Sequence, residues 1–125
     1  MSDIFSDLLT SMFAVAGWDL NKSHQFVMKL QETHELRLEN LRDMTEDEIA
    51  DLIVKSGFDR GSKVLDIMTT RVHSLATHLS ESNFSELNGY LASKEIPRVE
   101  FILKDINGVG PKVIENFLLL RGIVA

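Results

Sequence analysis

The stretch 103–118 constrains the fold of this chain more than any other part of its sequence. Four apolar residues precede its glycines at the spacing of one helical face: Val99, Ile102, Leu103 and Ile106. Gly108 and Gly110 then end this helix, because glycine adopts backbone conformations that other residues resist. Pro111 suits the first turn of a second helix, where its missing N–H leaves no hydrogen bond unmade. The sequence therefore predicts two helices joined by a tight turn, over about residues 97–121.

The turn has the composition of an anion site. The N–H groups at the start of a helix lie at the positive end of its dipole and favour phosphate. Neither glycine carries a side chain that would block a ligand, and we expect Val109 to point inward and fix the turn. The residues predicted to contact nucleic acid are Asn107, Gly108, Val109, Gly110 and Lys112. The alternative is an ordinary pair of packed helices with a glycine turn.

The remaining sequence also predicts helices, because proline is rare and no stretch alternates at period two. We expect a first helix over 3–16, a second after a cap at Asp19 or Asn21, and a short one over 35–41. A fourth helix should run from a capping box at Thr45–Glu48 to Gly57, and a long one from Gly61 to about Leu79. A loop and cap over 80–85 should lead into a short helix that holds Phe84, Leu87 and Leu91. The chain is therefore predicted to be one all-α domain, residues 1–125. It would be a compact bundle of seven or eight short helices ending in the hairpin.

Composition excludes several kinds of site. The chain has no cysteine, which rules out disulfides, thiolate zinc sites and iron–sulfur clusters. The spacing of the histidines suggests no metal site, and we predict neither a metal nor a cofactor. No apolar run reaches the roughly 18 residues of a membrane helix, and the acidic start of the chain is unlike a signal peptide. We expect a cytoplasmic protein without a membrane partner, associated with the nucleoid where it binds DNA.

The charge of the chain is distributed unevenly. Its net charge is −6, which argues against a general coat for DNA. Residues 1–59 hold 5 Lys or Arg and 12 Asp or Glu residues, whereas residues 60–125 hold 8 and 7. A nucleic acid should therefore meet the second half of the chain, with the acidic first half facing away.

Two blocks of the sequence together resemble one family. Residues 41–65 combine an acidic helix, a turn at Gly57-Phe58 and a long helix led by Lys63, and residues 103–120 hold the hairpin. In this order they resemble the helix-hairpin-helix DNA glycosylases, of the endonuclease III and 8-oxoguanine DNA glycosylase type. The chain looks like one lobe, or a truncated or minimal member. The resemblance implies DNA binding and a role in DNA repair.

The resemblance also implies a catalytic role for Lys112, which matches the position of the family's nucleophile. A neutral lysine there attacks C1′ of an extruded nucleotide, expels the damaged base and forms a Schiff base that allows strand cleavage. The family's downstream catalytic Asp is not found after Lys112, and Asp105 or Glu100 would have to substitute for it. Ile114 stands where the family has a small residue. Trp18, near the family's base-replacing segment, is expected either as a wedge or as a core residue.

Three functions follow from these observations. The first is a DNA glycosylase or abasic-site lyase that uses Lys112. The second is a catalytically silent helix-hairpin-helix module that binds the backbone of DNA or RNA. The third is an all-helical interaction protein. Four consecutive apolar residues, Phe117 to Leu120, lie on nearly every side of the last helix, so we expect a second copy or another chain to cover it.

Overall fold

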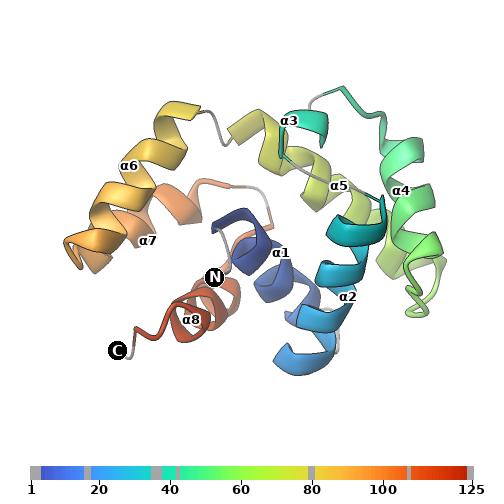
Figure 1. Cartoon of the computed structure of the whole chain (residues 1–125), viewed down its shortest axis with the longest axis horizontal. Helices are drawn as coiled ribbons and strands as arrows, with labels where there is room; N and C mark the ends of the chain where they lie inside the picture. Colours follow the sequence, from blue (N-terminus) through green and yellow to red (C-terminus); the bar gives the residue numbers. More distant parts are fainter. Residues whose placement is uncertain are drawn as a thin grey trace.

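Apolar residues at helical spacing and glycines between them produce an all-helical chain, as predicted. The structure, a computed structural model (Figure 1), describes residues 4–15, 18–34, 38–41, 43–78, 81–106 and 108–123. Within these ranges there are eight helices and no strand: α1 (Ile4–Val15), α2 (Leu20–His34), α3 (Leu38–Leu41), α4 (Glu46–Lys55), α5 (Ser62–His78), α6 (Glu81–Ala92), α7 (Ile96–Lys104) and α8 (Pro111–Leu120). The helices are short and make many long-range contacts, so the predicted compact all-α bundle is confirmed.

The helix boundaries agree with the sequence-based prediction except between α5 and α6. Asp19 caps α2, since its Oδ1 accepts a hydrogen bond from the Lys22 N–H at 2.7 Å. The predicted loop over 80–85 is wrong from Glu81 onward, because α6 already begins there. Ser and Asn favour both loops and the first turns of helices, so a polar run such as Ser82-Asn83 does not distinguish the two. Residue 80 and the predicted helical residues 35–37 lie outside the described ranges.

α1 is the central helix of the fold. It lies between α2 and α8, against which it packs most extensively (Figure 1). Every residue from Ile4 to Phe13 is buried, including four polar ones: Ser6, Asp7, Thr10 and Ser11. Its apolar residues share one broad face, but α2 and α8 cover the other faces as well. α1 therefore positions α8, the second helix of the hairpin.

The polar side chains of α1 are mostly satisfied by contacts within the core. Ser11 donates its hydroxyl hydrogen to the backbone oxygen of Asp7 at 2.7 Å. Arg121, directly after α8, donates to Asp7 Oδ2 at 3.0 Å, and only 5% of the Asp7 side chain is exposed. A buried carboxylate is costly unless it is paired, so this contact fixes the end of α8 against α1.

Trp18 belongs to an aromatic cluster in the core. Its ring centroid lies 4.9 Å from that of Phe26 and 5.5 Å from that of Phe58, and Phe13 contacts the same cluster. Only 7% of Trp18 is exposed. Of the two roles expected for this residue, the structure gives it the core position. The cluster joins the end of α1 to α2 and to the turn after α4.

Candidate nucleic-acid interface

The hairpin turn closes around Gly108. The Val109 N–H donates to the Ile106 carbonyl oxygen at 3.0 Å, which makes Ile106–Val109 a four-residue turn. Gly108, the third residue of this turn, has φ +89°, a conformation that glycine adopts at little cost. Val109 is 5% exposed and Ile106 3%, so the predicted inward orientation of Val109 is confirmed. These two apolar side chains anchor the turn to the core. Asn107, also predicted at this site, lies outside the described residues.

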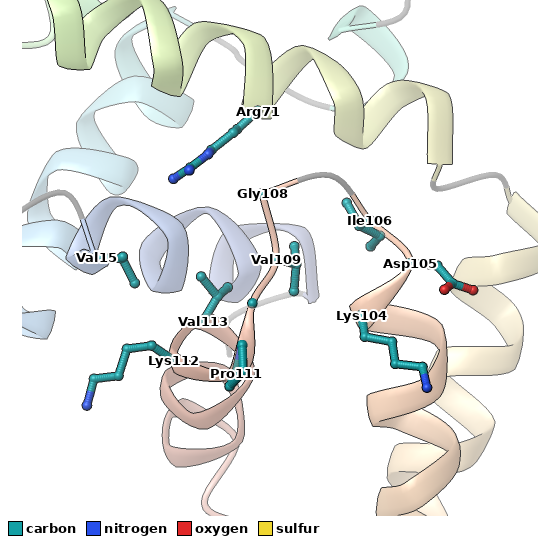
Figure 2. Close-up of a pocket in the computed structure, with 11 residues that line it drawn as sticks. Val15, Arg71, Lys104, Asp105, Ile106, Gly108, Val109, Pro111, Lys112 and Val113 are labelled. Atoms are coloured by element: carbon teal, nitrogen blue, oxygen red, sulfur yellow. The ribbon is translucent and has the colours of Figure 1, made fainter.

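A second constraint on Gly108 comes from α5. A Cβ atom added to Gly108 would lie 2.5 Å from Arg71 Cγ, 2.7 Å from its Cδ and 2.9 Å from its Cβ. The stem of Arg71 therefore passes directly over the glycine, and the absence of a side chain is what permits this approach. The Arg71 guanidinium extends from α5 past the turn, toward the end of α1 (Figure 2).

The N-terminus of α8 has no side-chain cap. Gly110 occupies the N-cap position in an extended conformation, with φ −100° and ψ −174°, and Pro111 follows as the first helical residue. The next N–H groups, those of Lys112 and Val113, belong to the first turn, where no intrahelical carbonyl is available. A Cβ atom added to Gly110 would meet nothing within 4 Å. The start of α8 therefore presents backbone donors at an unobstructed position.

An open pocket of about 660 Å³ lies at this N-terminus. Ile106 and residues 108–113 line it, together with Val15 at the end of α1 (Figure 2). Three cationic side chains and one carboxylate border the pocket: Arg71, Lys104, Lys112 and Asp105. The predicted site residues Gly108, Val109, Gly110 and Lys112 are thus brought together. Their surroundings carry an excess of positive charge, which favours an anion.

Two of the cations differ in their partners. Lys112 Nζ lies 3.5 Å from Glu115 Oε2, and 68% of the Lys112 side chain is exposed. Such an exposed pair contributes little and leaves the amine free to exchange partners. Arg71 makes no ion pair with any carboxylate that the structure describes. Sequence reasoning missed Arg71, because no local pattern around it points to the hairpin.

The two acidic residues considered as substitutes for the missing catalytic Asp differ in position. Asp105 borders the pocket, directly after α7. Glu100 is exposed on α7 and does not line the pocket. Figure 2 shows the Asp105 carboxylate and the Lys112 amine extending to opposite sides of the hairpin. The structure therefore does not bring either acid to the Lys112 amine, whose carboxylate partner is Glu115.

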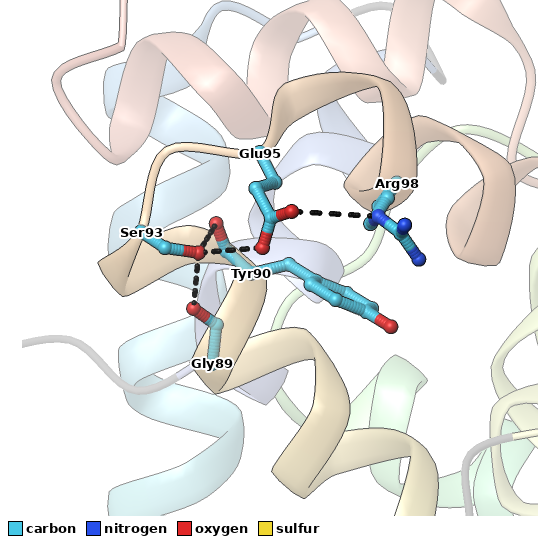
Figure 3. Close-up of polar contacts among 5 residues, drawn as sticks. All are labelled: Gly89, Tyr90, Ser93, Glu95 and Arg98. Carbon is cyan, nitrogen blue, oxygen red and sulfur yellow. Dashed lines mark hydrogen bonds and ion pairs between the residues drawn. The ribbon is translucent and has the colours of Figure 1, made fainter.

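The first turn of α7 is held by contacts to the end of α6. Ser93 Oγ lies 2.8 Å from Glu95 Oε2, and Glu95 Oε1 lies 3.4 Å from Arg98 Nε (Figure 3). The Glu95 N–H donates to the Tyr90 carbonyl oxygen at 2.8 Å, which closes the end of α6. These contacts set the direction in which α7 leaves α6 and so help position the hairpin.

The last helix is covered more fully by its own chain than the sequence suggested. Phe117 is 0% exposed and Leu118 7%, because α8 packs against α1. Leu119 remains 50% exposed. The expected homodimer or partner chain on this helix stays a prediction. Phe117 and Leu118 are already buried within the chain and need no partner to cover them.

Comparisons with protein-family models, with curated proteins and with solved structures gave no match. The resemblance to helix-hairpin-helix glycosylases therefore stays a prediction. Among the described residues there is no group of three His, Asp or Glu side chains that could hold a metal ion. None of the helices in the described ranges is long and apolar enough to cross a membrane.

Proposed function

We propose that this protein binds the sugar-phosphate backbone of nucleic acid, DNA in the first place, with the turn between α7 and α8. One observation carries the proposal: the uncapped N-terminus of α8 opens into a pocket bordered by Arg71 and Lys112. Backbone N–H groups at a helix N-terminus bind phosphate, and flanking cations add attraction that does not depend on base sequence. The protein would therefore bind without strong sequence preference.

The charge of the surroundings supports the same function. α4, on the acidic half of the chain, begins with Glu46, Asp47 and Glu48, and none of these three carboxylates lines the pocket. The hairpin presents cations instead, so a polyanion would be oriented toward it. Electrostatic orientation of this kind speeds association and depends on salt concentration.

Catalysis by Lys112 is a further proposal on the same pocket. A nucleophilic lysine is usually desolvated or lies beside another cationic group. Lys112 is instead 68% exposed, and its amine pairs with the Glu115 carboxylate at 3.5 Å. These contacts favour a phosphate contact over Schiff-base chemistry, and we therefore place backbone binding first.

The proposal is tested by binding of a labelled duplex of arbitrary sequence, followed by fluorescence anisotropy between about 50 and 200 mM salt. We expect binding that weakens with salt, and Lys112→Gln should reduce the slope of log K against log salt by about 0.9, the value of one lost phosphate contact. Lys55→Gln is the matched control, because Lys55 pairs with Asp51 on α4 and lies outside the pocket. Equal losses in the two variants, or no binding at all, would contradict the proposal.

A second measurement separates binding from catalysis. The protein is mixed with a duplex that contains an abasic site, and borohydride is added to reduce any Schiff base to a stable amine. Backbone binding alone predicts no covalent adduct. An adduct that forms in the wild type and is lost in Lys112→Ala would instead establish the lyase function.

A further inference from the structure

One aromatic side chain next to the hairpin is not used by the core. Phe101, on α7, is 62% exposed, the largest exposure among the large apolar side chains of the described residues. By contrast, Phe13 and Phe117 are completely buried. Leaving a phenylalanine ring in water forgoes the stabilisation that its burial would give. The ring is therefore available for a ligand.

Phe101 lies on the same side of α7 as two residues of the pocket. Lys104 and Asp105 follow it by three and four positions, which places all three on one helical face. Lys104 Nζ lies over the Phe101 ring, 5.0 Å from its centroid. Four residues advance about 6 Å along a helix axis, a distance that one extended nucleotide spans. The ring therefore lies about one helical turn from two residues that border the pocket, Lys104 and Asp105.

We propose that Phe101 stacks on an unpaired base of the strand whose backbone the hairpin holds, so that the preferred ligand is single-stranded nucleic acid. This inference rests on the function proposed above for the hairpin. Aromatic side chains beside a cationic backbone site bind single strands in this way, because every base offers a flat π face. A base within a duplex is stacked on its neighbours and does not offer that face to a ring on the surface of α7.

Lys104 adds to this arrangement on the protein side. Its ammonium lies over one face of the Phe101 ring in a cation–π contact, so a base would stack on the opposite face. The same residue lines the pocket that would hold the phosphate. Phe101 would therefore stack on a base while Lys104, one turn along the same helix, contacts the backbone phosphate.

The experiment compares three labelled probes of equal length: a single strand, the corresponding duplex, and a base-free strand made of abasic phosphodiester units. We expect the single strand to bind most tightly. Phe101→Ala should weaken its binding about tenfold, within the range for loss of one stacked base. The same variant should leave binding of the base-free strand and the salt dependence unchanged. Phe101→Tyr keeps a flat ring and should retain the affinity.

Leu119→Ala serves as the matched control, since Leu119 is 50% exposed on α8 and does not line the pocket. It should leave the binding of all three probes unchanged. If the single strand binds no better than the base-free strand, or if Phe101→Ala has no effect, the inference is wrong while backbone binding stands. If none of the probes binds, both proposals fail. If Phe101→Ala instead converts a dimer to a monomer in sedimentation and leaves binding unchanged, the ring belongs to an interface between copies and the inference is wrong.

Discussion

The N-termini of α4 and α8 differ in whether a side chain of the same helix accepts hydrogen bonds from the first-turn N–H groups. Each helix begins with N–H groups that find no carbonyl within the helix. At α4 the chain supplies the acceptors itself: the Glu48 N–H donates to Thr45 Oγ1 at 3.2 Å, and the Thr45 N–H donates to Glu48 Oε1 at 3.1 Å. At α8 the N-cap residue is Gly110, which has no side chain to accept a hydrogen bond. Of these two helices, only α8 has no side chain that accepts from its first-turn N–H groups.

The charges at the two N-termini reinforce this difference. The first turn of α4 carries three carboxylates, which stabilise the helix dipole and repel anions: Glu46, Asp47 and Glu48. The first turn of α8 carries Lys112, a cation at the end where a cation is unfavourable for the helix itself. A residue that opposes local stability is expected where function requires it. The comparison is consistent with the proposal that the N-terminus of α8 is left open to an anion.

The C-termini of the two helices show that this difference is not general. α4 is followed by Gly57 with φ +104°, and α8 by Gly122 with φ +74°. In both, the N–H of the next residue donates back to the last turn, from Phe58 to Ile53 and from Ile123 to Leu118. Both ends thus form the same glycine-containing Schellman motif. The two helices therefore differ at their N-termini, and the pocket lies at the N-terminus of α8.

The largest effect is expected from Gly108→Ala, which tests whether the open N-terminus of α8 depends on the turn before it. The substitution places a side chain at φ +89° and 2.5 Å from the Arg71 stem. The left-handed conformation and the overpacking together should lower the free energy of unfolding by about 3 kcal/mol. Urea unfolding followed by circular dichroism measures this loss.

Gly110→Ala is the control for that substitution. Its φ is −100° and its added Cβ meets nothing within 4 Å, so the expected loss is only about 0.5 kcal/mol, for a less favourable N-cap residue. Equal losses in the two alanine variants would mean that Arg71 does not pack over Gly108. They would also remove the reason for placing Arg71 at the pocket.

The contact between Gly108 and Arg71 marks the limit of what the sequence could predict. The helices, the capping box at Thr45 and the inward position of Val109 follow from patterns within a few residues, and the structure confirms them. Arg71 reaches the turn only because α5 packs over it, which no local pattern encodes. Composition indicated that the second half of the chain is less acidic than the first, without indicating which cation borders the pocket.

The same limit applies to α1. Its apolar residues share one face, yet its serines and Asp7 are buried as well, where α2 and α8 pack. The partner of Asp7 is Arg121, at the far end of the chain. Helical periodicity predicts which residues share a face, whereas the number of neighbours around a helix is decided by tertiary packing. The centre of the fold was therefore harder to predict than its turns.

Gly110→Asp should make the start of α8 resemble that of α4, with an intermediate effect. Gly110 already has the extended conformation of an N-cap residue, so an Asp side chain can accept from the first-turn N–H groups. We expect unfolding to become about 0.5 kcal/mol less favourable, while affinity for nucleic acid falls at least about tenfold, or 1.4 kcal/mol. Gly110→Asn caps the helix without a charge and separates the two causes. Binding that survives both substitutions would show that the α8 N-terminus is not the site.

Thr45→Ala opens the N-terminus of α4 and should have the smallest effect on nucleic-acid affinity. It removes the oxygen that accepts from the Glu48 N–H and should cost about 1 kcal/mol in the free energy of unfolding. Nucleic-acid affinity should not change, because the three carboxylates still repel phosphate and α4 does not line the pocket. Glu48→Gln keeps a capping side chain, so it should cost less than Thr45→Ala. A gain of binding in Thr45→Ala would mean that an open helix N-terminus suffices by itself, and that Arg71 and Lys112 are not what selects α8.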